Sequence, residues 1–568
     1  MLGVYTTPEE RPAAAEFFEL FKIPWEFYRD GVDYDALLCT IEPPGGSRAS
    51  MVIGFSSRPW AMDERFEMKC EPCARRTVTM HWKKLRIPLY GKVASVRARS
   101  GSGLAESEAG EPLAGLESRG PFHYVRVGYD LFHEVRFLLR EGQPSACAHA
   151  PTLDSHIAFL RWHLVACGWL LVEIPPVLPG FQFMACLTHD IDFADLRREG
   201  FGHTTRGFLW RAIFGSIRRW CTGRLSFDEM LENWKAAVQL PGILLGWARD
   251  IWNPFQQYLQ FERPFRATYF VIPFKGRPGQ QVRQAHPERR ATRYDAADVS
   301  SEIRQVNEGG GEIAVHGIDS WLSAEGAWRE RERLAAVLGT FPEGVRMHWL
   351  CFNADSPRLL ERAGFSYDST FGYNDTVGYR AGTLQAYRPL GCATLLELPL
   401  HIQDVAMFYP GSMDLRPAEA LRICRRMIQE ARMFGGVLTF LWHCRSLAPE
   451  RLWNRVYRQL LDDLNCENVW IAPASEIVAW FRWRRSVAIK SCDIADGEAR
   501  IGIEATGDCV RQPLAIRWYL RTGDEDTTVP EFVEVAWDGQ PEIAIRSREK
   551  FVLPSPMPQT KVFESAAG

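Results

Sequence analysis

Between about residue 181 and residue 480, short apolar runs alternate with segments whose apolar residues recur every three or four positions. The first pattern predicts buried strands, and the second predicts amphipathic helices. The candidate strands lie at 183–190, 266–273, 310–317, 343–350, 365–371, 394–402, 435–443 and 468–474. Strands that are each followed by a helix form parallel sheets, and this many repeats predicts a closed or partly closed (β/α) barrel.

Two of the predicted helices carry signals at their ends. Ser356 and Pro357 are typical of a first turn, and Gly364 follows as a C-terminal glycine. Another helix is predicted to begin near Pro417 and to end at Gly435, with apolar residues along one face.

The chain on either side of this region has a different pattern. Residues 1–180 mix helix-like and strand-like stretches, which predicts an N-terminal α/β accessory domain. Residues 486–568 contain short strands separated by turns, which predicts a small C-terminal antiparallel β domain with a loose tail over 553–568. The α/β barrel is therefore expected at 181–485, with a helical insert at about 196–262.

Composition narrows the class of protein. The 568 residues are 46% hydrophobic and 24% charged with a net charge of -3, as in a soluble protein without overall attraction to nucleic acid. The 14 cysteines are scattered, and the Cys70/Cys73 pair lacks the second pair of a zinc ribbon, so we expect free thiols. The sequence shows no secretory signal and no apolar run of about 18 residues, so we expect a cytoplasmic protein.

Titratable and cationic side chains collect at the ends of the candidate strands. They are His189, Asp190, Asp192, His316, Asp319, Arg346, His348, Asp368, His401, Asp404 and His443. Because the carboxyl ends of parallel barrel strands share one rim, these side chains are expected to meet there. The chain has only 13 histidines, so their concentration at strand ends favours a functional site.

Asp190 and Asp192 stand two positions apart where the first barrel strand ends. Two such carboxylates repel each other unless a cation lies between them. With a cation, Asp192 can bind the ion while Asp190 serves as a base, and an aspartate with imidazoles suits zinc. A divalent metal with an open position activates water and polarises a carbonyl, which predicts hydrolysis of an amide or an ester.

The ordered motifs of this region resemble those of the polysaccharide deacetylase family of carbohydrate esterases, whose catalytic domain is a distorted (β/α) barrel. The similar motifs are THDID (188–192), RATYFVIP (266–273), GGEIAVHGIDSW (310–321), GVRMHWL (344–350), FSYDST (365–370) and VLTFLWHCRS (437–446). The resemblance implies removal of N-acetyl groups from a sugar or polysaccharide, a hydrolysis of non-peptide C–N bonds, in bacterial surface polysaccharide metabolism.

The resemblance also implies roles for individual residues. Asp190 would be the general base, and Asp192 and His316 would bind the metal. Arg346 would orient Asp190, and His443 would protonate the leaving amine.

Three further residues receive supporting roles from the same resemblance. Leu441 and Trp442 would shape an acetyl pocket. Asp368 would be a partner for His443 or for a sugar hydroxyl.

One position departs from the family pattern. The second histidine of the metal motif is replaced by Ser320, so the third ligand must come from elsewhere. His348 is our candidate, and His189 and Asp319 are its rivals. A chain that lost its metal with this histidine would be a catalytically degenerate carbohydrate-binding protein, or only a scaffold for partners, and an intact site could also act as an O-acetyl esterase.

The predicted insert is rich in arginine and aromatic residues. Arginines at 206, 211, 218, 219 and 224 interleave with Phe208, Trp210, Phe214, Ile217 and Trp220. Such a helix can lie on an anionic membrane or line a groove for an acidic glycan. We favour a helical lid whose aromatic face packs on the barrel.

Overall fold

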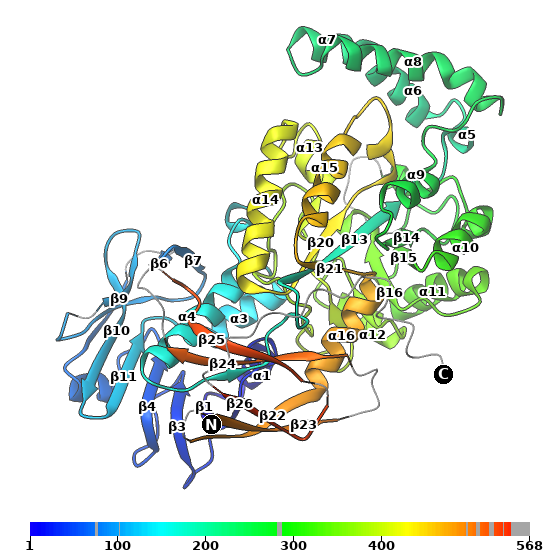
Figure 1. Cartoon of the computed structure of the whole chain (residues 1–568). Helices are drawn as coiled ribbons and strands as arrows, with labels where there is room; N and C mark the ends of the chain where they lie inside the picture. The colour runs from blue at the N-terminus through cyan, green and yellow to red at the C-terminus, as the bar shows by residue number, and fades with distance from the viewer. Residues whose placement is uncertain are drawn as a thin grey trace.

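The computed structural model describes residues 1–73, 78–101, 103–280, 287–495, 498–506, 512–521, 527–537 and 539–546. The tail predicted at 553–568 lies outside these residues. A parallel sheet with its helices occupies the middle of the chain, a mixed sheet precedes it, and antiparallel strands follow it (Figure 1).

The central sheet confirms the predicted parallel arrangement. Its strands run in the order β18-β17-β16-β15-β14-β13-β20-β19, and β21 also pairs with β13. All of these pairings are parallel. The strands are β13 (Phe183–Ile191), β14 (Thr268–Val271), β15 (Glu312–Gly317), β16 (Gly344–Met347), β17 (Tyr367–Asp368), β18 (Leu396–Glu397), β19 (Ile402–Gln403), β20 (Val437–Leu441) and β21 (Val469–Ile471).

This sheet curves into a half-barrel whose two edges are joined by one segment. The edge strands β18 and β19 follow each other in the chain with only 398–401 between them. The backbone N–H of Leu398 donates to the carbonyl of Asp368 at 2.8 Å, and that of His401 donates to the carbonyl of Thr439 at 3.3 Å. The linking residues therefore span the gap between the two sides of the sheet.

Helices pack around the half-barrel. They are α10 (Ser300–Glu308), α11 (Ala324–Leu338), α12 (Ser356–Arg362), α14 (Pro417–Phe434), α15 (Asn454–Asn465) and α16 (Ala474–Ser486). The predicted signals are confirmed, because α12 begins at Ser356 and α14 begins at Pro417. Gly364 and Gly435 follow these helices with φ of 84° and 75°, a conformation that favours glycine.

The N-terminal part contains a nine-stranded mixed sheet in the order β2-β1-β3-β4-β11-β10-β9-β6-β7. Its strands are β1 (Leu2–Tyr5), β2 (Trp25–Phe27), β3 (Asp33–Cys39), β4 (Arg48–Phe55), β6 (Val78–Trp82), β7 (Leu85–Leu89), β9 (Gly103–Ser107), β10 (Pro112–Arg119) and β11 (Phe122–Val127). The helices α1 (Arg11–Leu20), α3 (Leu131–Arg140) and α4 (Thr152–Ala166) contribute buried residues to its core.

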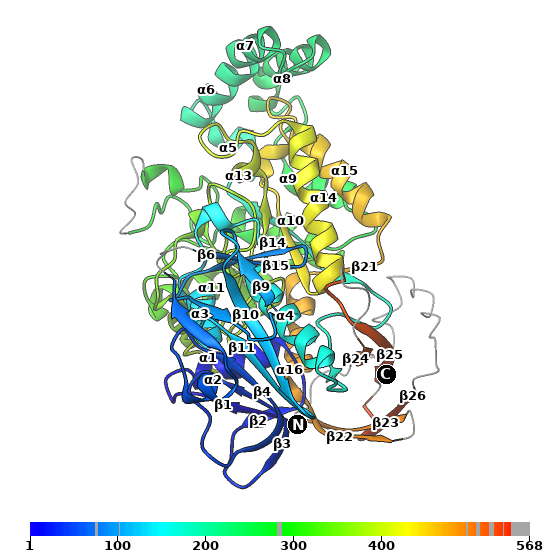
Figure 2. The same cartoon turned by 90° about the vertical axis from the view of Figure 1, so that its left-hand side faces the viewer.

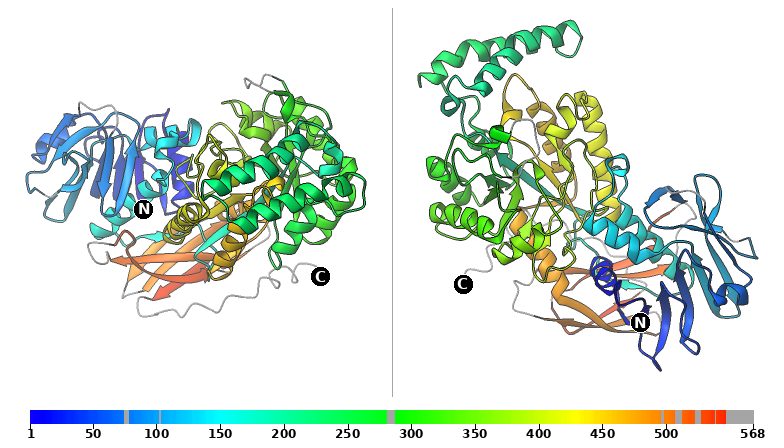
Figure 3. Two further views of the ribbon diagram at one scale, coloured as in Figure 1. Left: turned by 90° about the horizontal axis from the view of Figure 1, so that it is seen from above. Right: turned by 180° about the vertical axis from the view of Figure 1, so that it is seen from behind.

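The C-terminal strands are antiparallel and contact both preceding parts (Figure 3). They are β22 (Val487–Ala495), β23 (Glu498–Ala505), β24 (Leu514–Arg521), β25 (Glu531–Trp537) and β26 (Glu542–Arg546). β24 pairs with β12 (Val172–Glu173), a strand from the N-terminal third. The buried guanidinium of Arg484 in α16 donates to the carbonyls of Leu20 at 3.0 Å and Ile174 at 2.7 Å. These contacts tie the two ends of the chain to the barrel.

The insert forms helices that project from one end of the half-barrel (Figures 1 and 2). They are α5 (Leu196–Glu199), α6 (His203–Trp210), a π-helical turn (Arg211–Gly215), α7 (Ser216–Cys221), α8 (Phe227–Leu244) and α9 (Pro254–Phe261). Among the described residues, no helix has the length and apolar character needed to cross a bilayer.

The expectation that the aromatic face of the insert packs on the barrel is wrong. Trp210, Phe214 and Trp220 are 57%, 64% and 44% exposed. Phe208 lies on the opposite face of these helices and is buried. Its ring contacts the ring of Trp252 in a small separate hydrophobic cluster. The helices thus hold themselves together through one face and present the other to solvent.

Candidate active site and metal centre

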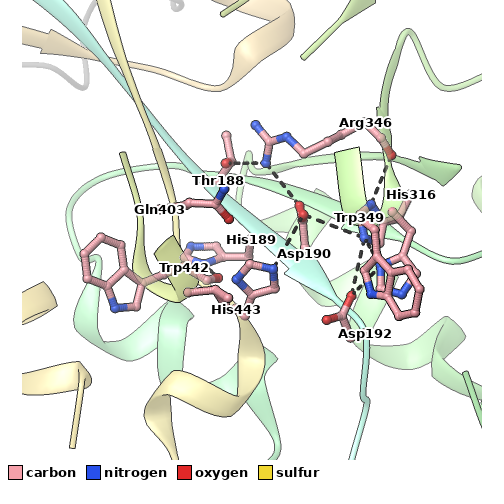
Figure 4. Close-up of polar contacts among 12 residues, drawn as sticks. Thr188, His189, Asp190, Asp192, His316, Arg346, Trp349, Gln403, Trp442 and His443 are labelled. Carbon is pink, nitrogen blue, oxygen red and sulfur yellow. Dashed lines mark hydrogen bonds and ion pairs between the residues drawn. The ribbon is translucent and has the colours of Figure 1, made fainter. Parts of the chain in front are cut away.

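β13 brings two carboxylates to the rim of the half-barrel. All nine residues of β13 are buried, and the alternation of side chains along a strand separates Asp190 from its neighbour His189. Asp192 directly follows the strand. Figure 4 shows the side chains of Asp190 and Asp192 directed toward His316.

The structure brings together the three side chains predicted to bind a metal. Oδ1 of Asp192 lies 3.3 Å from Nε2 of His316 and 3.2 Å from Nδ1 of His348. The two ring nitrogens lie 2.9 Å apart, and all three residues are buried. They come from the carboxyl ends of β13, β15 and β16; β15 and β16 are neighbours in the sheet, and β14 lies between β15 and β13.

The spacing of these three donors fits a cation. Atoms bound tetrahedrally at about 2.0–2.2 Å lie about 3.3–3.6 Å from one another, which is close to the separations found here. Oδ1 of Asp192 is also buried and, among the described residues, forms no well-angled hydrogen bond. Burial alone would raise the pKa of Asp192, but the charge of His348 and the contacts of both imidazoles bring that pKa well below its usual value. Asp192 therefore stays ionised, as a metal ligand must.

His189, a rival for the third ligand, belongs to the opposite face of β13. Its Nε2 lies 2.6 Å from a carboxylate oxygen of Glu262, and its Nδ1 lies 3.0 Å from the carbonyl of Trp442. The ring also stacks on Tyr258 at 3.6 Å. Both nitrogens are engaged, so His189 anchors α9 to the barrel and does not reach the cluster.

Ser320 and Asp319 fix the loop that follows β15. The hydroxyl of Ser320 donates to Glu330 of α11 at 2.6 Å, and the same carboxylate accepts the backbone N–H groups of Ile318 and Asp319 at 3.0 and 2.8 Å. Oδ1 of Asp319 accepts the backbone N–H of Gln280. Ser320 thus belongs to a loop anchor and does not reach the donor cluster, and the second imidazole of the cluster comes from His348, after the next strand.

Arg290 holds the two histidine-bearing loops together. Its Nη2 donates to the carbonyl of Ile318 at 3.0 Å and to the carbonyl of His348 at 3.1 Å. Trp349, which follows His348, has φ 64° and ψ 20°, a left-handed conformation that is uncommon outside glycine. This backbone turn and the Arg290 bridge fix the position of the third donor.

Arg346 is buried and positions Asp190. Its Nη1 donates to Oδ1 of Asp190 at 3.0 Å and to the hydroxyl of Thr188 at 2.7 Å. Its Nε and Nη2 donate to the carbonyl and hydroxyl of Ser369, both at 2.9 Å. The predicted Arg346–Asp190 contact is therefore present, and the other guanidinium nitrogens are fixed by the barrel.

The second oxygen of Asp190 faces the centre of the site. Oδ2 lies 3.7 Å from Nε2 of His316 and 4.0 Å from Nε2 of His443 (Figure 4). It is thus placed between the donor cluster and the predicted general acid.

The partner of His443 is Asp404, which received no role in the sequence analysis. Nδ1 of His443 lies 2.6 Å from Oδ1 of Asp404, and the backbone N–H of His443 donates to Oδ2 at 2.8 Å. The hydroxyl of Ser446 also contacts this carboxylate. Burial would lower the pKa of His443, but the charge and hydrogen bond of Asp404 and the charges of Asp192 and Asp190 raise it to about 9.

Two expectations for neighbouring residues need correction. Asp368 is not the partner of His443, because its carboxylate is buried beside Thr370 at the far side of Arg346 and Asp404 takes the expected place. Trp442 does not line the cleft, because it is fully buried and stacks on Tyr457. Leu441 does line it, as expected from the alternation along β20.

These groups open onto one cleft of about 120 Å³. Asp190, Asp192, His348 and His443 lie along it, together with Trp349, Leu350, Asn374, Gln403, Val405, Tyr409, Leu441, Arg445, Ser446, Arg451 and Trp453. Complete ligand pockets usually measure about 300–1,000 Å³, so this one has room for a small substituent and not for a whole oligosaccharide.

Comparisons with known proteins support no closer identification. No protein-family model and no curated protein matches the chain. It is similar to a solved structure from Mycobacterium smegmatis described as a polysaccharide deacetylase, at 20% identity and a TM-score of 0.33. The match covers 55% of this chain and 95% of that chain. It is also similar to Agd3, a carbohydrate deacetylase, at 9% identity and a TM-score of 0.40. That match covers 96% of this chain and 97% of Agd3. A third similar structure is the family 4 carbohydrate esterase from Streptomyces lividans, at 12% identity and a TM-score of 0.24. That match covers 51% of this chain and 92% of the esterase. Likenesses this distant leave the chemistry to be argued from the side chains.

The ligand set predicts a sharp difference between two substitutions. We expect His348→Ala to weaken zinc binding by about 100-fold or more, because one of three protein donors is lost. Asp319→Ala should leave zinc affinity unchanged, since that carboxylate binds the loop backbone. Zinc titration of the full chain with a competing chelator measures both, and equal affinities for the two variants would contradict this assignment.

Proposed function

We propose that this chain is a metal-dependent hydrolase that removes N-acetyl groups from a sugar or polysaccharide in surface polysaccharide metabolism. The arrangement of Asp190 carries the proposal. This carboxylate is fixed by Arg346 on one side and faces both a cluster of metal donors and the imidazole of His443 on the other. A base, a cation site and an acid around one small cleft suit hydrolysis of an amide.

Asp192, His316 and His348 are the residues that would hold the cation, for which we propose zinc. An aspartate with two imidazoles is a donor set typical of a catalytic zinc site with open coordination positions. When bound there, a divalent cation supplies Lewis acidity that polarises the acyl carbonyl and makes water more acidic.

Asp190 acts as the general base. Its Oδ2 accepts a proton from the water molecule that attacks the acetyl carbon. Arg346 keeps Oδ1 engaged, so that the side chain cannot turn away from the cleft.

His443 acts as the general acid. Its Nδ1 is held by Asp404, which leaves Nε2 directed into the cleft toward Asp190. The proton on Nε2 passes to the amine nitrogen as the C–N bond breaks. A histidine whose pKa is raised carries this proton at neutral pH.

Replacement of the base tests the proposal directly. We expect Asp190→Asn to lower acetate release from N-acetylated oligosaccharides by about 10²–10⁴-fold, and a chelator should abolish release by the unaltered protein. Asp319→Asn removes a carboxylate near the rim but outside the cleft, and it should retain activity. Full acetate release by Asp190→Asn would contradict the assigned base. Absence of acetate release by the unaltered protein would favour a degenerate barrel, and preference for O-acetyl over N-acetyl sugars would favour an esterase.

The pH dependence of the rate tests the role of Asp404. The acid form of His443 is lost as pH rises through its pKa of about 9, so the rate should fall on that side of the profile. Asp404→Asn removes the charge that raises this pKa and should move the basic limb to lower pH by about one unit or more. Ser446→Ala keeps the carboxylate and should move the limb less. An unchanged basic limb in Asp404→Asn would show that His443 is not the group that titrates.

We also propose that α6, the π-helical turn and α7 attach the protein to an anionic membrane surface. Residues 203–224 contain five arginines and no acidic residue, and Trp210, Phe214 and Trp220 are exposed among them. Aromatic rings inserted among lipid headgroups, with arginines beside anionic lipids, are typical of an interfacial helix.

Vesicle binding distinguishes this surface from an ordinary exposed helix. We expect Phe214→Ser together with Trp220→Ser to reduce co-sedimentation with vesicles that contain phosphatidylserine. Trp328→Ser is the matched control, because Trp328 on α11 is as exposed as Trp220, at 44%, but the arginines of its helix alternate with glutamates. Added salt should weaken binding of the unaltered protein. Equal binding by all variants would exclude the proposed attachment.

A further inference from the structure

Two arginines of the cleft have no acidic partner. Arg451 is only 7% exposed, and within the described part of the chain its side chain forms no hydrogen bond and no ion pair. Its guanidinium lies 4.5 Å from the ring of Trp453 and 5.9 Å from the ring of Tyr409. The guanidinium of Arg445 lies over Phe193 at 4.5 Å, and the described residues offer it no acceptor either.

The acidic groups nearest to these arginines are already engaged. Glu450, the neighbour of Arg451 in the chain, contacts Arg211 of the insert at 3.3 Å. Asp404 is bound to His443 and Ser446. Asp190 and Asp192 face Arg346 and the two imidazoles of the donor cluster. Aromatic rings contact both guanidinium groups. Among the described residues no carboxylate forms an ion pair with either arginine, although the charge of Glu450 offsets part of the charge of Arg451.

The carboxylates and guanidinium groups counted around the cleft are equal in number, so any added positive charge leaves the cleft with a net positive charge. Three carboxylates, at Asp190, Asp192 and Asp404, stand against three guanidinium groups, at Arg346, Arg445 and Arg451. A bound divalent cation and a protonated His443 add further positive charge. Burial, followed by the charges of Arg445 and Arg211, lowers the pKa of Arg451 to about 9, even though the charge of Glu450 acts in the opposite direction. A buried guanidinium without a counter-charge costs free energy that a bound anion would recover.

We infer that Arg451 and Arg445 form a subsite for an anionic group of the substrate, a phosphate or a carboxylate, beside the acetamido group that is cleaved. That the substrate is an acetylated sugar rests on the proposed function. That it also carries an anionic group rests only on the two arginines. Guanidinium groups bind both anions through charge-assisted hydrogen bonds, often with two contacts to one group. The substrate class is therefore an N-acetylated sugar that carries a phosphate or is linked to a uronic acid.

Anion binding to the full chain tests the subsite without any catalytic turnover. The protein is first treated with a chelator, so that anions cannot bind through a metal, and is then titrated by calorimetry with glucose 1-phosphate and, separately, with glucuronate. We expect at least one of the two to bind, and Arg451→Met to weaken that binding by about tenfold or more, in line with the loss of a charge-assisted hydrogen bond. Tighter binding of glucose 1-phosphate identifies a phosphorylated sugar, and tighter binding of glucuronate identifies a uronic acid.

Control variants separate this subsite from the metal centre and from misfolding. Asp192→Ala disrupts the donor cluster and should retain anion affinity, whereas Arg304→Met on the exposed side of α10 should change nothing. Arg445→Met, at a half-buried position, should also weaken binding and serves if Arg451→Met fails to fold. The subsite is refuted if neither anion binds the unaltered protein, or if both arginine variants bind as well as it does. Because no deacetylation is measured, an active Asp190→Asn variant would overturn the proposed function and leave the subsite standing.

Discussion

Two carboxylates buried at the end of one strand dominate the physics of this protein. Asp190 and Asp192 lie in the same cleft, where repulsion between like charges is strong because water is scarce. This repulsion is reduced because each carboxylate contacts a different set of positively charged or hydrogen-bonding groups. Arg346 compensates Asp190 through a fixed hydrogen bond, while Asp192 is left to His316 and His348 and to the cation that their spacing fits. The difference between the base and the ligand follows from this division.

The barrel makes that division possible because neighbouring strands end at the same rim. β13, β15 and β16 supply the donor cluster, β16 also supplies Arg346, and the residues after β19 and β20 supply Asp404 and His443. Each functional side chain is fixed by a contact to the next strand or loop, as Arg290 shows for the two histidine-bearing loops. The functional side chains are therefore fixed by hydrogen bonds, and the cleft onto which they open is lined largely by loop residues.

The sequence predicted the parts of the site that depend on strand position. The parallel sheet follows from the apolar pattern, and Asp192, His316 and His348 stood among the residues at strand ends. The Arg346–Asp190 contact was expected only from the resemblance to polysaccharide deacetylases. Asp404 also stood among the residues at strand ends. Its local sequence does not indicate that it, and not Asp368, would bind His443, which lies 39 positions away in the chain. The loop anchor of Ser320 depends on Glu330 in α11, and the contact of His189 depends on Glu262 at the end of the insert. The exposure of Trp210 and Phe214 could not be predicted either, because an amphipathic helix does not reveal which of its faces will find a partner.

The pairing of β12 with β24 has a consequence for the two regions that flank the barrel. A strand from the first third of the sequence completes a sheet built from the last tenth, and Arg484 fastens the first third to the final barrel helix. Removal of either flanking region would leave this sheet without one of its paired strands. The two flanking regions therefore depend on each other across the barrel that separates them in the chain.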